Sequence, residues 1–418
     1  MLMNERYSMF FDESQRTDIL RIDECGKPNF VDNNEIQSFI GVFSGLPTSR
    51  VDKFNESFLS FESRQRKIFH LSDDKEIKST MFDRSQFTFG FASLKKNNKG
   101  FYLDLFRTIQ NENIIFTISS FNKIEYLLNF MIVNLDVGEE LTNGFYYTLA
   151  KFLTLYGCPR FYELYPINPD DAIFVLVESM KKIIKADSSI ERLSNRNAAY
   201  RKTINILENC NYDLRPLDEI PFAYIMVPDS LVLHLQELGI EPSEVDLFID
   251  GEKNPLDCYD RFFESIKYVN SIDTPLIRVS DHIAGLFYKF IYHSKFNKNR
   301  KESKSDDSHE EKERKRLLYY KWFNLTEDSF NLYRLFFDAV LRNNDQYWSV
   351  MTSRYHDDVS YVIYLIRYFN EFASFDDYSK LSPEQHSDDF EKYACFWSDN
   401  TPDKPRNYLE ILDDRRLF

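Results

Sequence analysis

The sequence has 418 residues, more than the roughly 250–300 that one hydrophobic core usually supports, so we expect one main domain with an added region. Hydrophobic residues make up 43% of the chain and aromatic residues 16%, which excludes a disordered protein and favours a globular one. The net charge of -15, from 67 acidic and 52 basic residues, opposes nonspecific adhesion to nucleic acid or to an anionic membrane. A metal-dependent nuclease remains compatible with this charge, because it needs an acidic centre and can grip phosphates through a local basic patch.

The cysteines and the lengths of the apolar runs indicate the cellular compartment in which we expect the protein. The five cysteines are scattered and form no CxxC pair, which indicates neither zinc binding nor redox chemistry and favours a reducing compartment. No apolar segment of signal-peptide length precedes Asp12, and no later run approaches the ~18 apolar residues that a membrane span needs. We therefore expect a soluble, cytoplasmic protein with no membrane partner.

Strand signals open the chain. Residues 7–14, YSMFFDES, are apolar on both faces of a strand, which predicts a central strand that ends at Asp12. Residues 18–24 and 39–46 give two further strand signals across short polar turns, so we expect an antiparallel meander at the start of the sheet. An Asp at a strand end often only begins a turn, and that interpretation of Asp12 stays open.

Helical periodicity follows in two regions. Residues 51–69 have the apolar spacing of a helix, and after another strand signal at 113–120 the pattern is helical from residue 123 to about 210. The second region predicts a helical insertion in the sheet domain, at about residues 123–220. The far end of the first helix is basic, with Arg64, Arg66 and Lys67.

The polar segment 71–80, LSDDKEIKST, contains Glu76 and Lys78. Asp73, three residues before Glu76, fits a capping box, which would make Glu76 a local helix-start device. A functional carboxylate is the alternative interpretation of Glu76.

The later part of the main domain is predicted to alternate strands and helices. Strand signals occur at 222–227 and 245–250, and the second ends in Asp250-Gly251, which is also a common turn dipeptide. A helix is predicted at 256–269 and a strand at 275–279. Ser280 then has the position of an N-cap and places Asp281 in the first turn of a helix, where a carboxylate is favoured in any case.

The end of the chain has a different character. Residues 296–316 are almost wholly polar and are predicted to form a charged linker. Residues 317–418 are predicted to form a helical appendage, with helices at SFNLYRLFFDAVLRN and VSYVIYLIRYF. We find no catalytic pattern in this region.

The order of the predicted elements resembles the ribonuclease H-like fold, whose sheet begins with an antiparallel meander and whose strand ends and final helix bring four carboxylates together. The strings FFDES, KEIKS, FIDG and VSDHIAG are similar to motifs of a bacterial domain-of-unknown-function family, the one numbered three thousand eight hundred. The similarity covers residues 1–295 discontinuously, and Gln15 stands where this family commonly has the glycine of DESG. It implies an α/β fold with a ribonuclease H-like mixed sheet, a helical insertion and a helical C-terminal appendage. The corresponding acids are Asp12, Glu76, Asp250 and Asp281.

Four carboxylates packed together repel one another, and divalent cations with a preference for oxygen ligands relieve that repulsion. We therefore expect two Mg²⁺ or Mn²⁺ ions held by these four acids and a nuclease that hydrolyses phosphodiester bonds. Asp12 would be shared by both ions, Glu76 and Asp250 would lie on one side, and Asp281 on the other. The cations expected to contact the phosphates of RNA or DNA are Lys78, Arg64, Arg66 and Lys67.

Two other classes of function stay open. The acidic centre could be vestigial in a scaffold that acts with a partner protein or as a homo-oligomer, or it could serve a phosphatase or nucleotide hydrolase. Neither a P-loop GxxxxGK[ST] nor a zinc-hydrolase HExxH occurs. By analogy alone, the resemblance implies a bacterial anti-phage or mobile-element system.

Overall fold

The fold is described from a computed structural model of the chain. The residues that the structure describes are 5–14, 19–20, 28–29, 36–72, 75–189, 193–216, 220–221, 226–251, 259–296, 318–342, 349–351 and 354–400.

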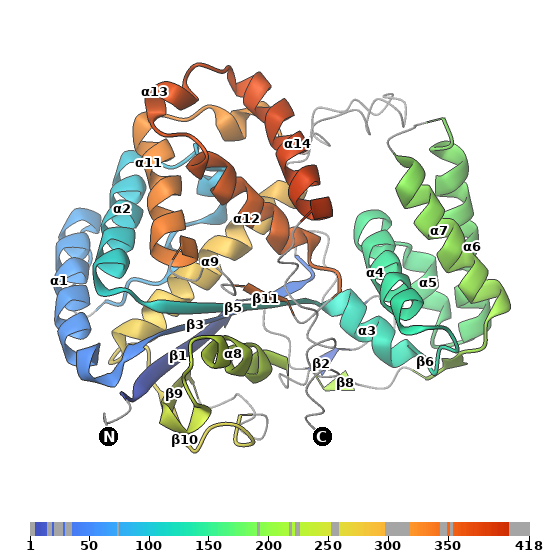
Figure 1. The fold of residues 1–418 in the computed structure, drawn as a ribbon, viewed down its shortest axis with the longest axis horizontal. Helices are drawn as coiled ribbons and strands as arrows, with labels where there is room; N and C mark the ends of the chain where they lie inside the picture. The colour runs from blue at the N-terminus through green and yellow to red at the C-terminus, as the bar shows by residue number, and fades with distance from the viewer. Residues whose placement is uncertain are drawn as a thin grey trace.

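A mixed sheet runs through the molecule and makes this an α/β fold (Figure 1). In the described part of the chain the sheet has six strands in the order β10-β9-β1-β3-β5-β11. Among the first three strands of this sheet along the chain, β3 is antiparallel to both of its neighbours, β1 and β5. β9 runs parallel to β1, and β10 runs parallel to β9. The strands are β1 (Tyr7–Ser14), β3 (Ser38–Pro47), β5 (Ile115–Asn122), β9 (Val245–Asp250), β10 (Ser265–Val269) and the short edge strand β11 (Ser349–Met351).

The alternation of side chains along β1 explains its central place. Met9 and Phe11 are buried on one face of the sheet, and Phe10 is buried on the other. The prediction of a central strand apolar on both faces is confirmed. The antiparallel meander predicted for 7–14, 18–24 and 39–46 is confirmed only in the pairing of 7–14 with 39–46. The strand predicted separately at 113–120 is β5, which pairs antiparallel with β3.

The strand predicted at 18–24 does not join the main sheet. Its described residues form β2 (Ile19–Leu20), which pairs with β8 (Ile220–Pro221) in a separate two-stranded sheet. The apolar alternation was sufficient to indicate a strand, but its partner is 200 residues away along the chain, so β1 pairs directly with β3.

Helices cover both faces of the sheet (Figure 1). The face that buries Phe10, here called the α9 face, packs against the helices α1 (Val51–Phe69), α2 (Lys96–Glu112), α9 (Pro275–Phe296), α11 (Glu327–Phe336), α12 (Asp357–Asn370) and α14 (Pro383–Asn400). On the opposite face α3 (Lys123–Met131) and α8 (Met226–Glu237) contact β5. Beyond α3 lies a group of helices that pack on one another and share the hydrophobic core of this face, namely α4 (Glu139–Tyr156), α5 (Pro159–Leu164), α6 (Pro169–Ala186) and α7 (Ser194–Asn209) (Figure 1). The helix predicted at 51–69 and the helical insertion after residue 123 are therefore present.

The region after residue 317 belongs to the hydrophobic core of the α9 face. Its helices α11 and α12 pack on α2 and α9, and β11 extends the sheet beside β5. Most of the predicted linker, residues 297–316, lies outside the described residues.

Four predictions between residues 222 and 281 are wrong in the part that the structure describes. A helix was predicted at 256–269, but its last five residues form β10, and 252–258 lie outside the described residues. The segment 275–279, predicted as a strand, is the first part of α9, because a short apolar run fits a buried helix as well as a strand. Ser280 is consequently no N-cap, and Asp281 lies in the second turn. Of the strand predicted at 222–227, the described part begins α8.

No helix among the described residues is long and apolar enough to cross a lipid bilayer.

Candidate metal and phosphate site

Asp12 and Asp250 lie side by side where two parallel strands end. β1 and β9 are in register, with Phe11 opposite Ile249, so each acid is the next residue at the same edge of the sheet. Phe10 precedes Asp12 by two residues, and Phe248 precedes Asp250 by two residues. Both rings lie on the α9 face and stack with centroids 4.7 Å apart. Since strand side chains alternate, both carboxylates project toward α9.

Asp281 comes to the same place from α9. This helix packs across β1 and β3, and the hydroxyl of Ser280 donates to the carbonyl of Phe10 over 3.0 Å. Asp281 accepts two hydrogen bonds from Ser79, from the backbone N over 2.7 Å and from Oγ over 2.6 Å. A Cβ on Gly285 would lie 2.6 Å from the Cβ of Ser79, so the absence of a side chain there permits this contact.

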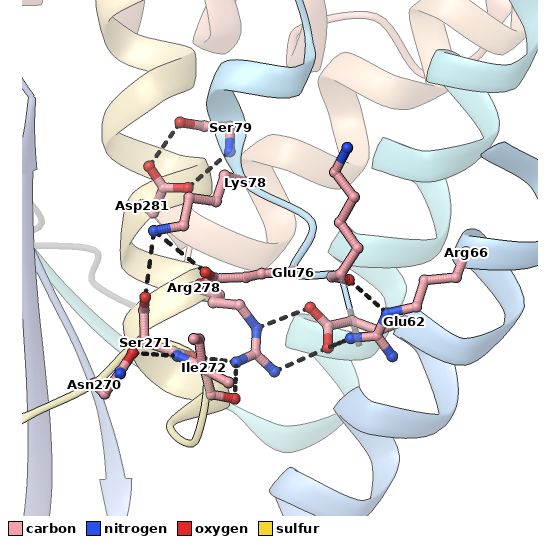
Figure 2. A network of polar contacts seen from close by, with 11 residues as sticks. Glu62, Arg66, Glu76, Lys78, Ser79, Asn270, Ser271, Ile272, Arg278 and Asp281 are labelled. Atoms are coloured by element: carbon pink, nitrogen blue, oxygen red, sulfur yellow. Dashed lines mark hydrogen bonds and ion pairs between the residues drawn. The ribbon is translucent and has the colours of Figure 1, made fainter. Parts of the chain in front are cut away.

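Glu76 and Lys78 belong to an irregular segment just before the short 3-10 helix η2 (Ser79–Met81), and Glu76 is not on a helix as the sequence suggested. The partner of the predicted capping box, Asp73, lies outside the described residues. The Lys78 ammonium lies 3.2 Å from Glu76 Oε2 and donates to Ser271 Oγ over 3.4 Å (Figure 2). It is 47% exposed, whereas the Glu76 side chain is 12% exposed.

The pKa shifts show that these groups act on one another. Burial raises the pKa of Asp12 well above its usual range, and the neighbouring carboxylates of Asp281, Glu13 and Asp250 raise it further. Burial also raises the pKa of Asp250, with added repulsion from Glu76 and Asp281 and partial relief from Lys78.

Lys78 responds in the opposite sense. Burial lowers its pKa, but the attraction of Glu76, Asp250 and Asp281 is stronger and the net pKa is raised. The structure therefore brings three of the four predicted acids, Glu76, Asp250 and Asp281, within electrostatic range of one lysine. The fourth, Asp12, interacts with Asp281 and Asp250.

The predicted basic trio lies apart from that lysine, at the end of α1. Arg66 donates from Nε to the carbonyl of Lys75 over 2.8 Å and from Nη2 to Glu62 Oε2 over 3.1 Å, so its guanidinium is engaged within the protein. Arg64 donates to Ser60 Oγ over 3.1 Å, and Lys67 is exposed. Arg64 and Lys67 keep a solvent-facing charge that a phosphate could reach.

The donor set has the chemistry of a site for a hard divalent cation. All four predicted ligands are carboxylates, the ligands that such a cation prefers. Burial and the neighbouring carboxylates raise the pKa of Asp12 well above its usual range. Glu76 Oε1 is buried and accepts no hydrogen bond from any residue that the structure describes. Nevertheless, among the described residues no three His, Cys, Asp or Glu side chains surround a common point at which a metal ion could bind. In the present arrangement Lys78 provides the cationic charge.

Sequence reasoning did not identify several polar residues that support the site. Ser271 contacts Lys78, and its backbone amide hydrogen-bonds to Asp250. Lys289 donates to the carbonyl of Ser79 over 2.8 Å, and burial lowers its pKa to about 8. Arg278 and Glu62 form a buried ion pair beneath the site. In the sequence these residues are ordinary polar positions in helices and turns, and no local signal distinguishes them.

Comparisons with protein-family models, with curated proteins and with solved structures found no match for this chain.

Proposed function

We propose that the protein is a metal-dependent nuclease that hydrolyses phosphodiester bonds at the centre formed by Asp12, Glu76, Asp250 and Asp281. The observation that supports this proposal is the electrostatic interaction among acids from β1, β9, α9 and the segment before η2, although they are separated by up to 269 residues (281 − 12). Asp12 interacts with Asp250 and Asp281. Asp250 also interacts with Glu76. The antiparallel start of the sheet, followed by two parallel strands, supports a ribonuclease H-like identity for the fold.

The chemistry follows from the donor set. When bound, two Mg²⁺ or Mn²⁺ ions would supply an activated water and a positive charge beside the leaving oxygen. Asp12 would hold both ions, with Glu76 and Asp250 on one side and Asp281 on the other. Ser79 keeps the Asp281 carboxylate oriented through its two hydrogen bonds.

The cations near the centre suit a phosphate-containing polymer. Lys78 is long and half exposed, so its ammonium could turn from Glu76 toward a substrate phosphate. Arg64 and Lys67 could contact the phosphate backbone further away. Because the net charge of -15 opposes nonspecific binding, these local contacts would have to provide the attraction to RNA or DNA. A cytoplasmic bacterial anti-phage or mobile-element setting follows only from the resemblance of the motifs.

One observation favours a second function, that of a non-catalytic scaffold or binding subunit with a vestigial centre. Lys78 already contacts Glu76 and lowers the repulsion at Asp250, so the protein compensates part of its acidic charge without a metal. In that case the centre would be a structural ion cluster, and function would depend on a partner protein or a second copy of the chain.

Cleavage of labelled single-stranded and duplex RNA and DNA in Mn²⁺ or Mg²⁺ separates the two proposals. We expect cleavage by the wild type and loss of it in Asp12→Asn and Asp250→Asn. Asp246→Asn is the matched control, because Asp246 lies on the same strand as Asp250 but pairs with Arg6 over 3.0 Å at its other end. Equal cleavage by wild type and folded Asp250→Asn would show that the nuclease site is elsewhere. Cleavage of free nucleotides alone would instead indicate a nucleotide hydrolase.

A further inference from the structure

We propose that Glu62 is a positioning residue that holds together the two irregular segments of the acidic centre, residues 75–78 and 270–272. The inference deepens the proposed function and rests on it for its catalytic meaning. Glu62 lies on α1 and touches none of the four acids through a hydrogen bond, so its hydrogen-bonded connection to the centre runs through its two arginine partners. Its charge also repels that of Glu76.

The Glu62 carboxylate is buried between two guanidinium groups (Figure 2). Arg278 donates to it from Nε and from Nη2, each over 2.8 Å, in a bidentate arrangement. Arg66 donates to Oε2 over 3.1 Å. The Glu62 side chain is 1% exposed and that of Arg278 2%, so neither charge is solvated and each depends on the other.

Arg278 connects this pair to the turn after β10. Its Nη1 donates to the carbonyl of Ser271 and, over 2.9 Å, to the carbonyl of Ile272. Ser271 in turn contacts Lys78 through its hydroxyl and Asp250 through its backbone amide. The orientation of this turn therefore bears on both an acid and the central lysine.

Arg66 connects the same carboxylate to the other segment. Its Nε donates to the carbonyl of Lys75 over 2.8 Å, directly before Glu76. Lys75 and the three residues after it belong to no helix or strand, so few backbone hydrogen bonds fix their course. The hydrogen bond from Arg66 holds the backbone of Lys75 in place, directly before the proposed metal ligand Glu76.

Glu62 thus links two segments that are almost 200 residues apart in the chain, and Lys78 and Ser271 meet where the segments approach (Figure 2). Replacing Glu62 by Gln preserves shape but removes the charge that orients both arginines and places an amide NH₂ against a donor. Both segments should loosen together. Residues that hydrogen-bond directly to metal ligands typically change metal affinity by about 10- to 100-fold when altered. Glu62 is one contact further from the ligands, so we expect an effect at the lower end of this range.

The test compares Glu62→Gln with Glu125→Gln. Glu125 is also a buried carboxylate, 3% exposed, that accepts from Arg354 and from the amide of Tyr355, but it lies on α3 on the opposite face of the sheet. Three quantities are measured in the full chain: the melting temperature, the Mn²⁺ dissociation constant by calorimetry, and hydrogen exchange of the amides in 75–79 and 270–273. Both variants should melt at lower temperature, so melting alone does not distinguish positioning from general stability.

We expect Glu62→Gln to exchange faster in both segments and to bind Mn²⁺ about tenfold more weakly, with neither change in Glu125→Gln. Unchanged exchange in both segments, or equal loss of Mn²⁺ affinity in the two variants, would overturn the proposal. If the wild type itself binds no Mn²⁺, the proposed nuclease function fails, while the exchange of the two segments still decides whether Glu62 positions them.

Arg66→Gln provides a second test should Glu62→Gln fail to fold. Arg66 is 14% exposed and can be replaced at lower cost to the core. We expect faster exchange in 75–79 and unchanged exchange in 270–273, because Arg278 keeps its carboxylate. Equal exchange of both segments in Arg66→Gln and wild type would show that this arginine does not transmit the position of Glu62.

Discussion

Asp281 and Ser79 are joined by two hydrogen bonds to one carboxylate, from the Ser79 amide over 2.7 Å and from its hydroxyl over 2.6 Å. They fix the segment that carries Glu76 and Lys78 against α9. Ser79→Ala removes one donor to a charged acceptor, and we expect a loss of about 1–3 kcal/mol in the free energy of unfolding. Urea denaturation measures it, and a stability within about 0.5 kcal/mol of wild type would show that the hydroxyl contributes little.

A substitution at Gly285 tests the close approach of α9 to Ser79. A Cβ at this position would come within 2.6 Å of the Cβ and Oγ of Ser79, so Gly285→Ala should cost about 1–3 kcal/mol. Gly144→Ala is the matched control, since this glycine lies within α4 and a Cβ there would meet nothing within 4 Å. The control should gain up to about 1 kcal/mol from helix propensity. Equal thermal stability of the two variants would contradict the packing described here.

The sheet could be predicted where the sequence is locally decisive. The runs that form β1, β3 and β5 combine apolar side chains with clear turn residues, and the amphipathic spacing of α1 gave its bounds correctly. The first turn of α9 was mistaken for a strand because PLIRV is apolar except for Arg278, and a short, mainly apolar run fits a buried helix as well as a buried strand. The pairing of β2 with β8 depends on contacts between distant segments, for which the chain has no local signal.

The acids could be proposed from sequence for a related reason. Asp12 and Asp250 each follow an apolar strand, and parallel neighbours end at the same edge of a sheet, so their meeting follows from the strand order. The support from Glu62 and Arg278 could not be foreseen, since 216 residues separate them and each is a charged residue in a helix, a kind that usually faces solvent.

Asp12 predicts an unusual dependence of stability on pH. Its pKa in the folded protein is raised above the ordinary 3.8, so the folded state binds more protons than the unfolded state between the two values. Stability should therefore fall as pH rises through this window, and the loss should persist at neutral pH. Asp12→Asn lacks the ionisable group and should be more stable than wild type at pH 7 in EDTA, with the difference disappearing near pH 3. Urea denaturation at both pH values measures this, and a less stable Asp12→Asn at pH 7 would contradict the assigned environment.

Lys78 should compete with a divalent cation for the same carboxylates. Lys78→Met removes the ammonium near Glu76, Asp250 and Asp281. Because an ion pair this exposed contributes about 0–1 kcal/mol, Mn²⁺ affinity should increase by about two- to fivefold. Lys75→Met is the control, because only the backbone carbonyl of Lys75 contacts Arg66. Calorimetric titration gives both affinities, and a weaker affinity in Lys78→Met would show that the lysine assists cation binding.

The most direct test of the central claim is a crystal structure of the protein grown with Mn²⁺, with the metal located by its anomalous scattering. We predict anomalous peaks bounded by the carboxylates of Asp12, Asp250 and Asp281, with the Lys78 ammonium moved away from Glu76. A map without such peaks, in which Lys78 still contacts Glu76 and Ser271 at saturating Mn²⁺, would contradict a metal-dependent nuclease and leave an internally compensated acidic cluster.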